Sequence, residues 1–221
     1  MRVTQQEGSR GSLGWLQRLV SRHPQVLEDA ARAGHALQPG ESVHWVSPQS
    51  QDGWAEYRDG DFLVQVGRPE LRGALAAFWP PRGPQWDALG RGSAGTVLLV
   101  EAKAHLAELA SSCQASPESR AMIERALGWA RAELGADGAA DWGAGYYQYA
   151  NRLAHLQFLR AQSVPAALLF VYFTNDTVIG GPRSREEWAP GHAAAYRHLG
   201  FRGAFNVPGV VNVYVDTRTL V

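Results

Sequence analysis

Apolar residues recur along this chain at two spacings, one typical of helices and one typical of strands. Helical spacing, with capping residues at several ends, predicts helices over residues 12–22, 24–34, 69–78, 116 to about 130, 146–162 and from 184 onward. Apolar runs predict strands over residues 42–46, 85–89, 97–104, 166–173 and 210–216. Because helices and strands alternate, we expect an α/β fold with a central mixed sheet flanked by helices.

Composition is consistent with one globular domain. The chain has 221 residues, an apolar fraction of 45% and eight tryptophans, which is enough for a substantial core. Cys113 is the only cysteine, which excludes an intrachain disulfide and a cysteine-rich zinc site and fits a reducing compartment. No stretch approaches the roughly 20 apolar residues of a membrane span. We expect a soluble, cytoplasmic protein without a membrane partner, with a flexible arm over residues 1–11 and a single domain over residues 12–221.

Charge gives only weak information about partners. The formal net charge is zero, from 21 basic and 21 acidic residues, which argues against a general nucleic-acid binder with a basic excess. The segment 146–221 is less balanced, with seven arginines against four acidic residues. That segment could present a positive surface to phosphates or could simply be a solvated face.

Lys103 is the only lysine, because the other twenty basic side chains are arginines. An ammonium is a compact point charge with a tunable pKa and three rotatable donors, whereas guanidinium is a planar fork that stays protonated. A coding bias that depletes lysine would also leave a single survivor at an arbitrary position. The place of Lys103, two residues after Glu101 at the polar end of an apolar strand, favours a functional role.

Residues two apart in a strand face the same way, about 6.6 Å apart along it. Leu99, Glu101, Lys103 and His105 should therefore share one face of the predicted strand. Charges at the end of a buried strand are costly unless they are paired or bind an ion. A simple Glu101–Lys103 ion pair is one interpretation, and a catalytic or metal site, which His105 could assist, is the other.

Asp87 favours the second interpretation. If residues 85–89 pair with residues 97–104 as an antiparallel hairpin, Asp87 comes close to Glu101. Two carboxylates, the Ala102 carbonyl and several waters would suit octahedral Mg²⁺ or Mn²⁺. Such a metal lowers the pKa of a bound water, and Lys103 could orient that water or stabilise negative charge in the transition state.

The arrangement Pro84-x-x-Asp87, a hairpin, then Glu101-Ala102-Lys103 resembles the PD-(D/E)XK nuclease superfamily. The resemblance spans residues 12 to about 175, although the motif itself is only a few residues and here two residues separate the proline from the aspartate. It implies a restriction-endonuclease-like core (αβββαβ) with an added C-terminal helix and strand. It also implies metal-dependent phosphodiester cleavage, with Asp87 and Glu101 as metal ligands and Lys103 as the catalytic lysine.

The same resemblance suggests accessory residues and a partner. The helix over 146–162 carries Gln148, Asn151 and Arg152, similar to the polar helix motif of RecB-like nucleases, but Gln148 is followed by Arg152 where that motif has tyrosine. Many members add a glutamate from the first helix, for which Glu28 is the candidate and Glu56 the substitute. The implied partner is nucleic acid, DNA before RNA, and an oligomer is compatible with the pattern.

Three further interpretations compete. Gly90-Arg-Gly-Ser-Ala-Gly95 matches a dinucleotide-binding fingerprint, but that loop should open a helix, whereas here it precedes the strand from Thr96. A catalytically inactive nuclease-like scaffold, serving as a nucleic-acid or protein interaction module, fits the neutral charge and the loose helix motif. A Schiff-base role for Lys103 requires a lowered pKa, which the adjacent Glu101 opposes.

Overall fold

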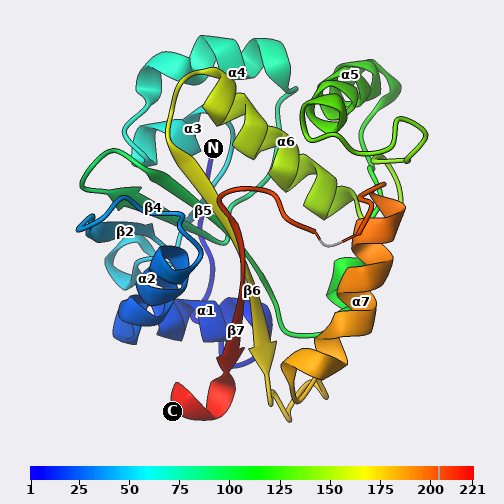
Figure 1. Cartoon of the computed structure of the whole chain (residues 1–221). Coiled ribbons are helices and arrows are strands. Elements are labelled where there is room, and N and C mark those ends of the chain that lie inside the picture. The colour runs from blue at the N-terminus through cyan, green and yellow to red at the C-terminus, as the bar shows by residue number, and fades with distance from the viewer. Residues whose placement is uncertain (204) are drawn as a thin grey trace.

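The computed structural model describes residues 1–203 and 205–221. Within these residues, five strands form one mixed sheet in the order β2-β4-β5-β6-β7 (Figure 1). The strands are β2 (Val43–Ser47), β4 (Ala88–Gly92), β5 (Val97–Lys103), β6 (Ala166–Thr174) and β7 (Val210–Asp216). Neighbours from β2 to β5 are antiparallel, and β5, β6 and β7 are parallel. The α/β class with a mixed sheet is therefore confirmed.

Helices cover both faces of this sheet. On one face lie α1 (Gly11–Arg22) and α2 (Pro24–Ala33). The other face is covered by α3 (Asp59–Gln65), α4 (Arg72–Phe78), α5 (Pro117–Glu133), α6 (Tyr147–Ala161) and α7 (Arg185–His198). Short 3₁₀ turns are η1 (Ser50–Asp52), η2 (Pro69–Leu71), η3 (Leu106–Leu109) and η4 (Thr217–Thr219). Each face thus has its own apolar core, and every residue of β5 between them is buried.

Alternation along β5 decides which core each side chain enters. Leu98, Val100 and Ala102 pack with α1 and α2, whereas Val97 and Leu99 pack with the opposite core. By the two-residue period of a strand, Glu101 and Lys103 continue the face of Leu99. The two charged groups therefore share one face, as the sequence pattern predicted, and that face is toward the layer that contains α6.

The β4–β5 hairpin forms, but three residues later than predicted for its first strand. The strand is Ala88–Gly92 where residues 85–89 were expected, and Gly90 and Gly92 lie in it and not in the loop. These glycines allow close approach. A Cβ at Gly90 would lie 3.0 Å from a methyl carbon of Val43, and one at Gly92 would lie inside the Glu41 carboxylate. Because the glycines serve a hairpin that leads into β5, the dinucleotide interpretation is wrong here.

The segment 1–11, expected to be a flexible arm, makes specific contacts in the structure. Its β1 (Arg2–Val3) pairs antiparallel with β3 (Glu56–Tyr57), and the Gln5 side chain donates to Glu56. A two-residue strand has too little periodicity to be found from sequence, which is why β1 and β3 were missed. Within the described part of the chain, no helix has the length and apolarity to cross a membrane.

Candidate functional site

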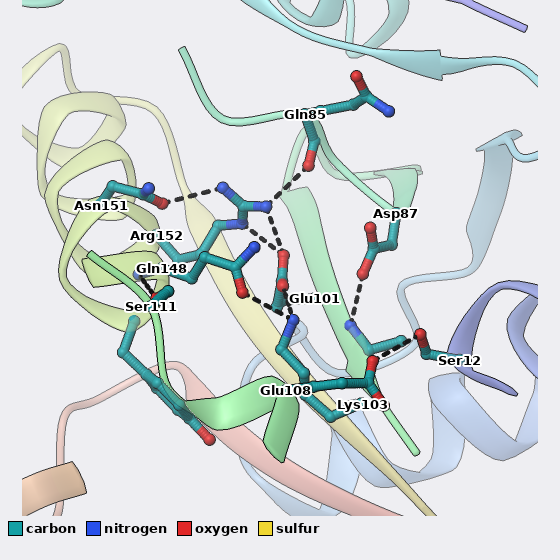
Figure 2. Close-up of polar contacts among 12 residues, drawn as sticks. Ser12, Gln85, Asp87, Glu101, Lys103, Glu108, Ser111, Gln148, Asn151 and Arg152 are labelled. Atoms are coloured by element: carbon teal, nitrogen blue, oxygen red, sulfur yellow. Dashed lines mark hydrogen bonds and ion pairs between the residues drawn. The ribbon is translucent and has the colours of Figure 1, made fainter. Parts of the chain in front are cut away.

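A polar cavity of about 460 Å³ opens where β4 begins and β5 ends. Its walls come from Ser12, Glu56, residues 82–85, Asp87, residues 101–103, residues 111, 112 and 114, and four residues of α6, namely Tyr147, Gln148, Asn151 and Arg152. Figure 2 shows the polar contacts of several of these residues. Segments far apart in the sequence thus supply one concentrated set of charged and amide groups.

Asp87 lies opposite Glu101 in the hairpin. The paired register ends at Ala88 and Val100, and Asp87 and Glu101 are the next residue outward on each segment. The Asp87 carboxylate accepts a hydrogen bond from the Ala102 backbone N–H at 2.8 Å, which fixes its orientation beside β5 (Figure 2). The predicted approach of Asp87 to the Glu101–Lys103 strand end is therefore found.

Glu101 is held between two cations. Its Oε1 forms an ion pair with Lys103, and its Oε2 accepts from Arg152 Nε at 2.6 Å. Both partners are buried, with Lys103 6% exposed and Arg152 4% exposed. A buried carboxylate with two charge-assisted partners is fully compensated, which explains how the charge is tolerated at this position.

The first turn of α6 positions Gln148 above Lys103. The Gln148 backbone N–H donates to Ser111 Oγ at 2.9 Å, and the Gln148 side-chain oxygen accepts from Lys103 Nζ at 3.0 Å. The single lysine therefore uses two of its three donors on Glu101 and Gln148. Its third donor is available to a group in the cavity.

Arg152 links α6 to the residues that lead into β4. It donates to the Gln85 backbone carbonyl at 2.8 Å and to the Asn151 side chain at 2.9 Å. Its guanidinium also lies 4.8 Å from the centroid of the Trp86 ring. Arg152 thus fixes the distance between the helix and the hairpin, with Glu101 between them.

The electrostatics of the two facing carboxylates differ. Burial, then the nearby charge of Glu101, raises the pKa of Asp87 well above its usual range. Burial would also raise the pKa of Glu101, but Arg152 and Lys103 outweigh it and lower that pKa. Asp87 is therefore the group whose ionisation an additional positive charge would favour.

Lys103 stays protonated in this environment. Burial alone would lower its pKa, but the carboxylates of Glu101 and Asp87 outweigh burial and raise it. A Schiff-base nucleophile needs the opposite shift, so the objection raised from the sequence holds in the structure.

Glu56 supplies a third carboxylate to the cavity wall. It accepts hydrogen bonds from Gln5 and from Gln85. Burial, reinforced by Glu101, raises the pKa of Glu56 despite these amide donors. Of the two glutamates considered as an accessory acid, Glu56 is the one that lines the cavity.

Two predicted accessory residues lie elsewhere. Glu28 is on α2, which packs against the opposite face of the sheet from Glu101, and it pairs with Arg32 at 3.8 Å. His105 follows the end of β5, where the chain turns into η3, so strand alternation no longer applies. Its Nδ1 accepts from the Ala107 N–H at 3.0 Å as a cap of that turn. Assigning either residue to the site was wrong.

Several groups near the site were missed from the sequence. Arg82 and Gln85 flank Pro84 in the wall, and their position next to the proposed motif was the available signal. Ser12 lies at the start of α1 and donates to Glu108 at 2.9 Å, while Glu108 accepts the backbone N–H of Ala104 and of His105. No periodicity links Ser12 with Glu108, so sequence alone could not place them together.

The cavity offers few donor groups for a metal ion. Among the described residues, no group of three or more His, Cys, Asp or Glu side chains is arranged to hold one. Two carboxylates remain, together with the Ala102 backbone. The backbone N–H and C=O groups of successive β5 residues point alternately to the two neighbouring strands. The Val97 N–H donates to Pro165, on the side of β6. The Ala102 N–H donates to Asp87, so the Ala102 C=O also points to the Asp87 side. Mg²⁺ is commonly held by one or two carboxylates with several waters, which this set fits.

No protein-family model, curated protein or solved structure matches this chain.

Proposed function

We propose that the protein is a divalent-metal-dependent phosphodiesterase with a restriction-endonuclease-like core, acting on nucleic acid, DNA before RNA. The observation that carries this proposal is the convergence of Asp87, Glu101 and Lys103 in one polar cavity, with Asp87 opposite Glu101 in the hairpin. This is the arrangement that the resemblance to PD-(D/E)XK nucleases requires. An unrelated surface ion pair would need neither the facing Asp87 nor the cavity.

In this proposal Asp87, Glu101 and the Ala102 carbonyl hold Mg²⁺ or Mn²⁺. A bound divalent cation would supply a water of lowered pKa and would neutralise charge on the phosphodiester. The nearby charge of Glu101, which together with burial raises the pKa of Asp87, is a repulsion that a cation bound by both carboxylates would offset. The cavity wall has the three carboxylates of Glu56, Asp87 and Glu101 around the two buried cations Lys103 and Arg152.

The remaining residues position and stabilise. Lys103, protonated, directs its third donor at the attacking water or at a phosphate oxygen, where charge grows in the transition state. Gln148 orients the ammonium from α6. Arg152 sets the position of Glu101 and leaves it ionised.

One observation favours a second candidate, the inactive nuclease-like scaffold. Arg152 and Lys103 together engage both oxygens of Glu101, so a metal would have to share a carboxylate that is already compensated. In a scaffold this ion-pair network would be structural, and the cavity would bind a partner without hydrolysis.

Cleavage assays separate the two candidates. Single-stranded DNA, duplex DNA and RNA are incubated with Mg²⁺ or Mn²⁺ and with wild type or Lys103→Met. We expect metal-dependent cleavage that falls about 100- to 1000-fold in Lys103→Met, the usual effect of losing one transition-state donor. The control is Arg197→Met, which removes a positive charge from an exposed position on α7. Wild type that fails to cleave any of the substrates, or cleavage equal in both proteins, would contradict the proposal.

A further inference from the structure

A second cavity adjoins the first and has a different character. Its volume is about 520 Å³, and its wall includes Trp79, Ser119 and Ile123. The two cavities share Arg82, Gln114 and Tyr147, so they form neighbouring compartments on either side of these side chains. The first compartment is lined by charged groups, whereas the second combines aromatic and aliphatic walls with hydroxyl and amide groups.

Arg82 lies at the boundary in an unusual conformation. Its φ of +68° is one that non-glycine residues rarely adopt. Asp59, which also has a positive φ of +53°, fixes this turn by accepting the backbone N–H of Arg82 at 3.3 Å and of Gly83 at 2.8 Å. The exposed guanidinium is thus displayed from a constrained backbone, a combination that is common at binding sites.

Tyr147 forms the other side of the boundary. It is the first residue of α6, next to Gln148, and is half-buried. Burial, with the neighbouring Cys113, raises the pKa of its phenol, so the ring stays neutral. Trp79 is a buried residue in the wall of the second cavity, and Gly83 packs against its indole. A flat π-system entering this compartment would therefore meet aromatic side chains.

We propose that the second cavity receives the base of the nucleotide next to the scissile phosphate, while Arg82 binds the phosphate that joins the two compartments. This inference rests on the proposed nuclease function and specifies its substrate class as nucleic acid with unpaired bases. The polar edge groups Gln114 and Ser119 face the base, and Tyr147 stacks on it.

Base pairing determines whether a base can enter the second cavity, and so distinguishes single-stranded from duplex DNA as a substrate. In a duplex the bases are stacked inside the helix and reach a lateral pocket only after the nucleotide is turned out of the stack, which costs a few kcal/mol. Single strands avoid that cost, and aromatic stacking tolerates every base. The combination of a charged compartment with an adjoining aromatic one therefore favours single-stranded over duplex DNA.

Binding, measured separately from cleavage, tests this inference. Fluorescence anisotropy follows labelled oligothymidylate, and the same strand paired with oligoadenylate, in Ca²⁺ with wild type, Arg82→Gln, Ser119→Phe and Tyr147→Leu. Ser119→Phe fills the second cavity, and Tyr147→Leu removes a stacking ring. We expect tighter binding of the single strand by wild type, and about 5- to 150-fold weaker binding in the two cavity variants.

The arginine variant has its own signature. Arg82→Gln should weaken binding and reduce the slope of log affinity against log salt by about 0.7 for a single strand. Arg197→Gln, with the same charge change on α7, should leave affinity and slope unchanged. Tyr147→Phe keeps the ring and should bind as wild type does, which separates stacking from folding defects.

Two outcomes would overturn the inference. The first is that wild type binds the duplex as tightly as the single strand, or more tightly. The second is that the folded variants Ser119→Phe and Arg82→Gln bind the single strand as tightly as wild type does. Failure of the nuclease proposal appears differently, as absence of metal-dependent cleavage in wild type. A protein that binds single strands through this cavity without cutting them would reject catalysis and keep the subsite.

Discussion

Two buried polar clusters lie in the same layer of the molecule, and they differ in charge and in access. The site cluster consists of Asp87, Glu101, Lys103, Gln148 and Arg152 and opens into the 460 Å³ cavity. The tyrosine cluster consists of Tyr149, Tyr172, His192, Tyr196 and Tyr214 and lies between α6, α7, β6 and β7. One contains full charges, and the other is built from neutral groups.

The tyrosine cluster shows how polar groups serve a core. Tyr149 and Tyr172 share a hydrogen bond of 2.6 Å between their hydroxyls, and Tyr214 bonds to His192 at 3.0 Å. Burial lowers the pKa of His192 to about 4, so the imidazole is neutral near pH 7. Neutral, hydrogen-bonded hydroxyls cost little to bury, and the one unpartnered atom of the cluster is the buried His192 Nε2.

The site cluster has features that packing does not require. Three ionised groups, Glu101, Lys103 and Arg152, are buried together, although apolar residues of the same size commonly stabilise as well or better. Asp87 adds a carboxyl whose pKa is raised by its surroundings. Charged groups with perturbed pKa values beside a cavity are characteristic of functional sites. The contrast between the clusters is therefore the main support for a role in chemistry.

The largest expected effect on stability comes from breaking the charged cluster. Arg152→Met should lower the free energy of unfolding by about 3 kcal/mol, because it removes one partner of a buried ion pair and the bonds to Gln85 and Asn151. Urea denaturation measures the change. Arg197→Met on the exposed side of α7 is the control and should stay within about 0.5 kcal/mol of wild type. An equal response of the two variants would mean that Arg152 is not a structural ion-pair partner.

One group in each cluster, His192 and Asp87, should respond to pH in opposite directions, whereas Glu101, whose pKa is lowered, adds to the loss of stability in acid. The lowered pKa of His192 means that the unfolded chain binds its proton first as pH falls below about 6.5, so stability is lost from there down to pH 4. The raised pKa of Asp87 means that its carboxyl stays protonated to a higher pH in the folded protein than in the unfolded chain. The stability from that group is therefore present in acid and is lost as pH rises above about 4.

Urea denaturation across pH 4–8 without divalent metal tests this opposition. His192→Phe should reduce the loss of stability in acid. The reduction should be smaller than ~1.4 kcal/mol per pH unit, the slope produced by a difference of one bound proton between the folded and unfolded states. Asp87→Asn should remove part of the loss toward neutral pH. A residual acid-side loss is expected from His155, whose pKa burial lowers to about 3. If both variants changed the same side of the profile, the electrostatic contrast would be wrong.

The smallest expected effect is a single neutral hydrogen bond. Tyr172→Phe removes the hydroxyl that contacts Tyr149 and should lower the free energy of unfolding by about 1 kcal/mol. Cleavage and metal binding should be unchanged, because Tyr172 does not line the cavity. A loss of activity without a loss of stability would connect the tyrosine cluster with the site.

The sequence predicted the elements whose pattern is strong and local. Strand alternation predicts the apolar run of β5 with Glu101 and Lys103 at its end. The short connection between β4 and β5 predicts the hairpin that brings Asp87 close to Glu101. The contribution of α6 to the site could also be predicted, because Gln148 and Arg152 are unusually polar for a central helix. All three elements carry their signal within a few residues.

The rest depended on tertiary arrangement. Glu28 was assigned to the site because many PD-(D/E)XK nucleases add a glutamate from the first helix, yet α2 packs on the opposite face of the sheet. Glu56 lies on a two-residue strand whose partner is β1, a pairing across more than fifty residues. Arg82 reaches the cavity boundary only because Asp59 fixes its turn. Such contacts between distant segments leave no periodic trace in the sequence.

The most direct test of the account is calorimetric titration of Mn²⁺ into wild type, Asp87→Asn and Asp29→Asn at pH 7. Asp29 is exposed on α2, so its variant controls for the lost charge. We predict one binding event in wild type and in Asp29→Asn, and at least a tenfold loss of affinity in Asp87→Asn, because one of two carboxylate ligands is gone. Binding of equal strength in all three proteins, or none in wild type, would contradict a shared cation site at Asp87 and Glu101.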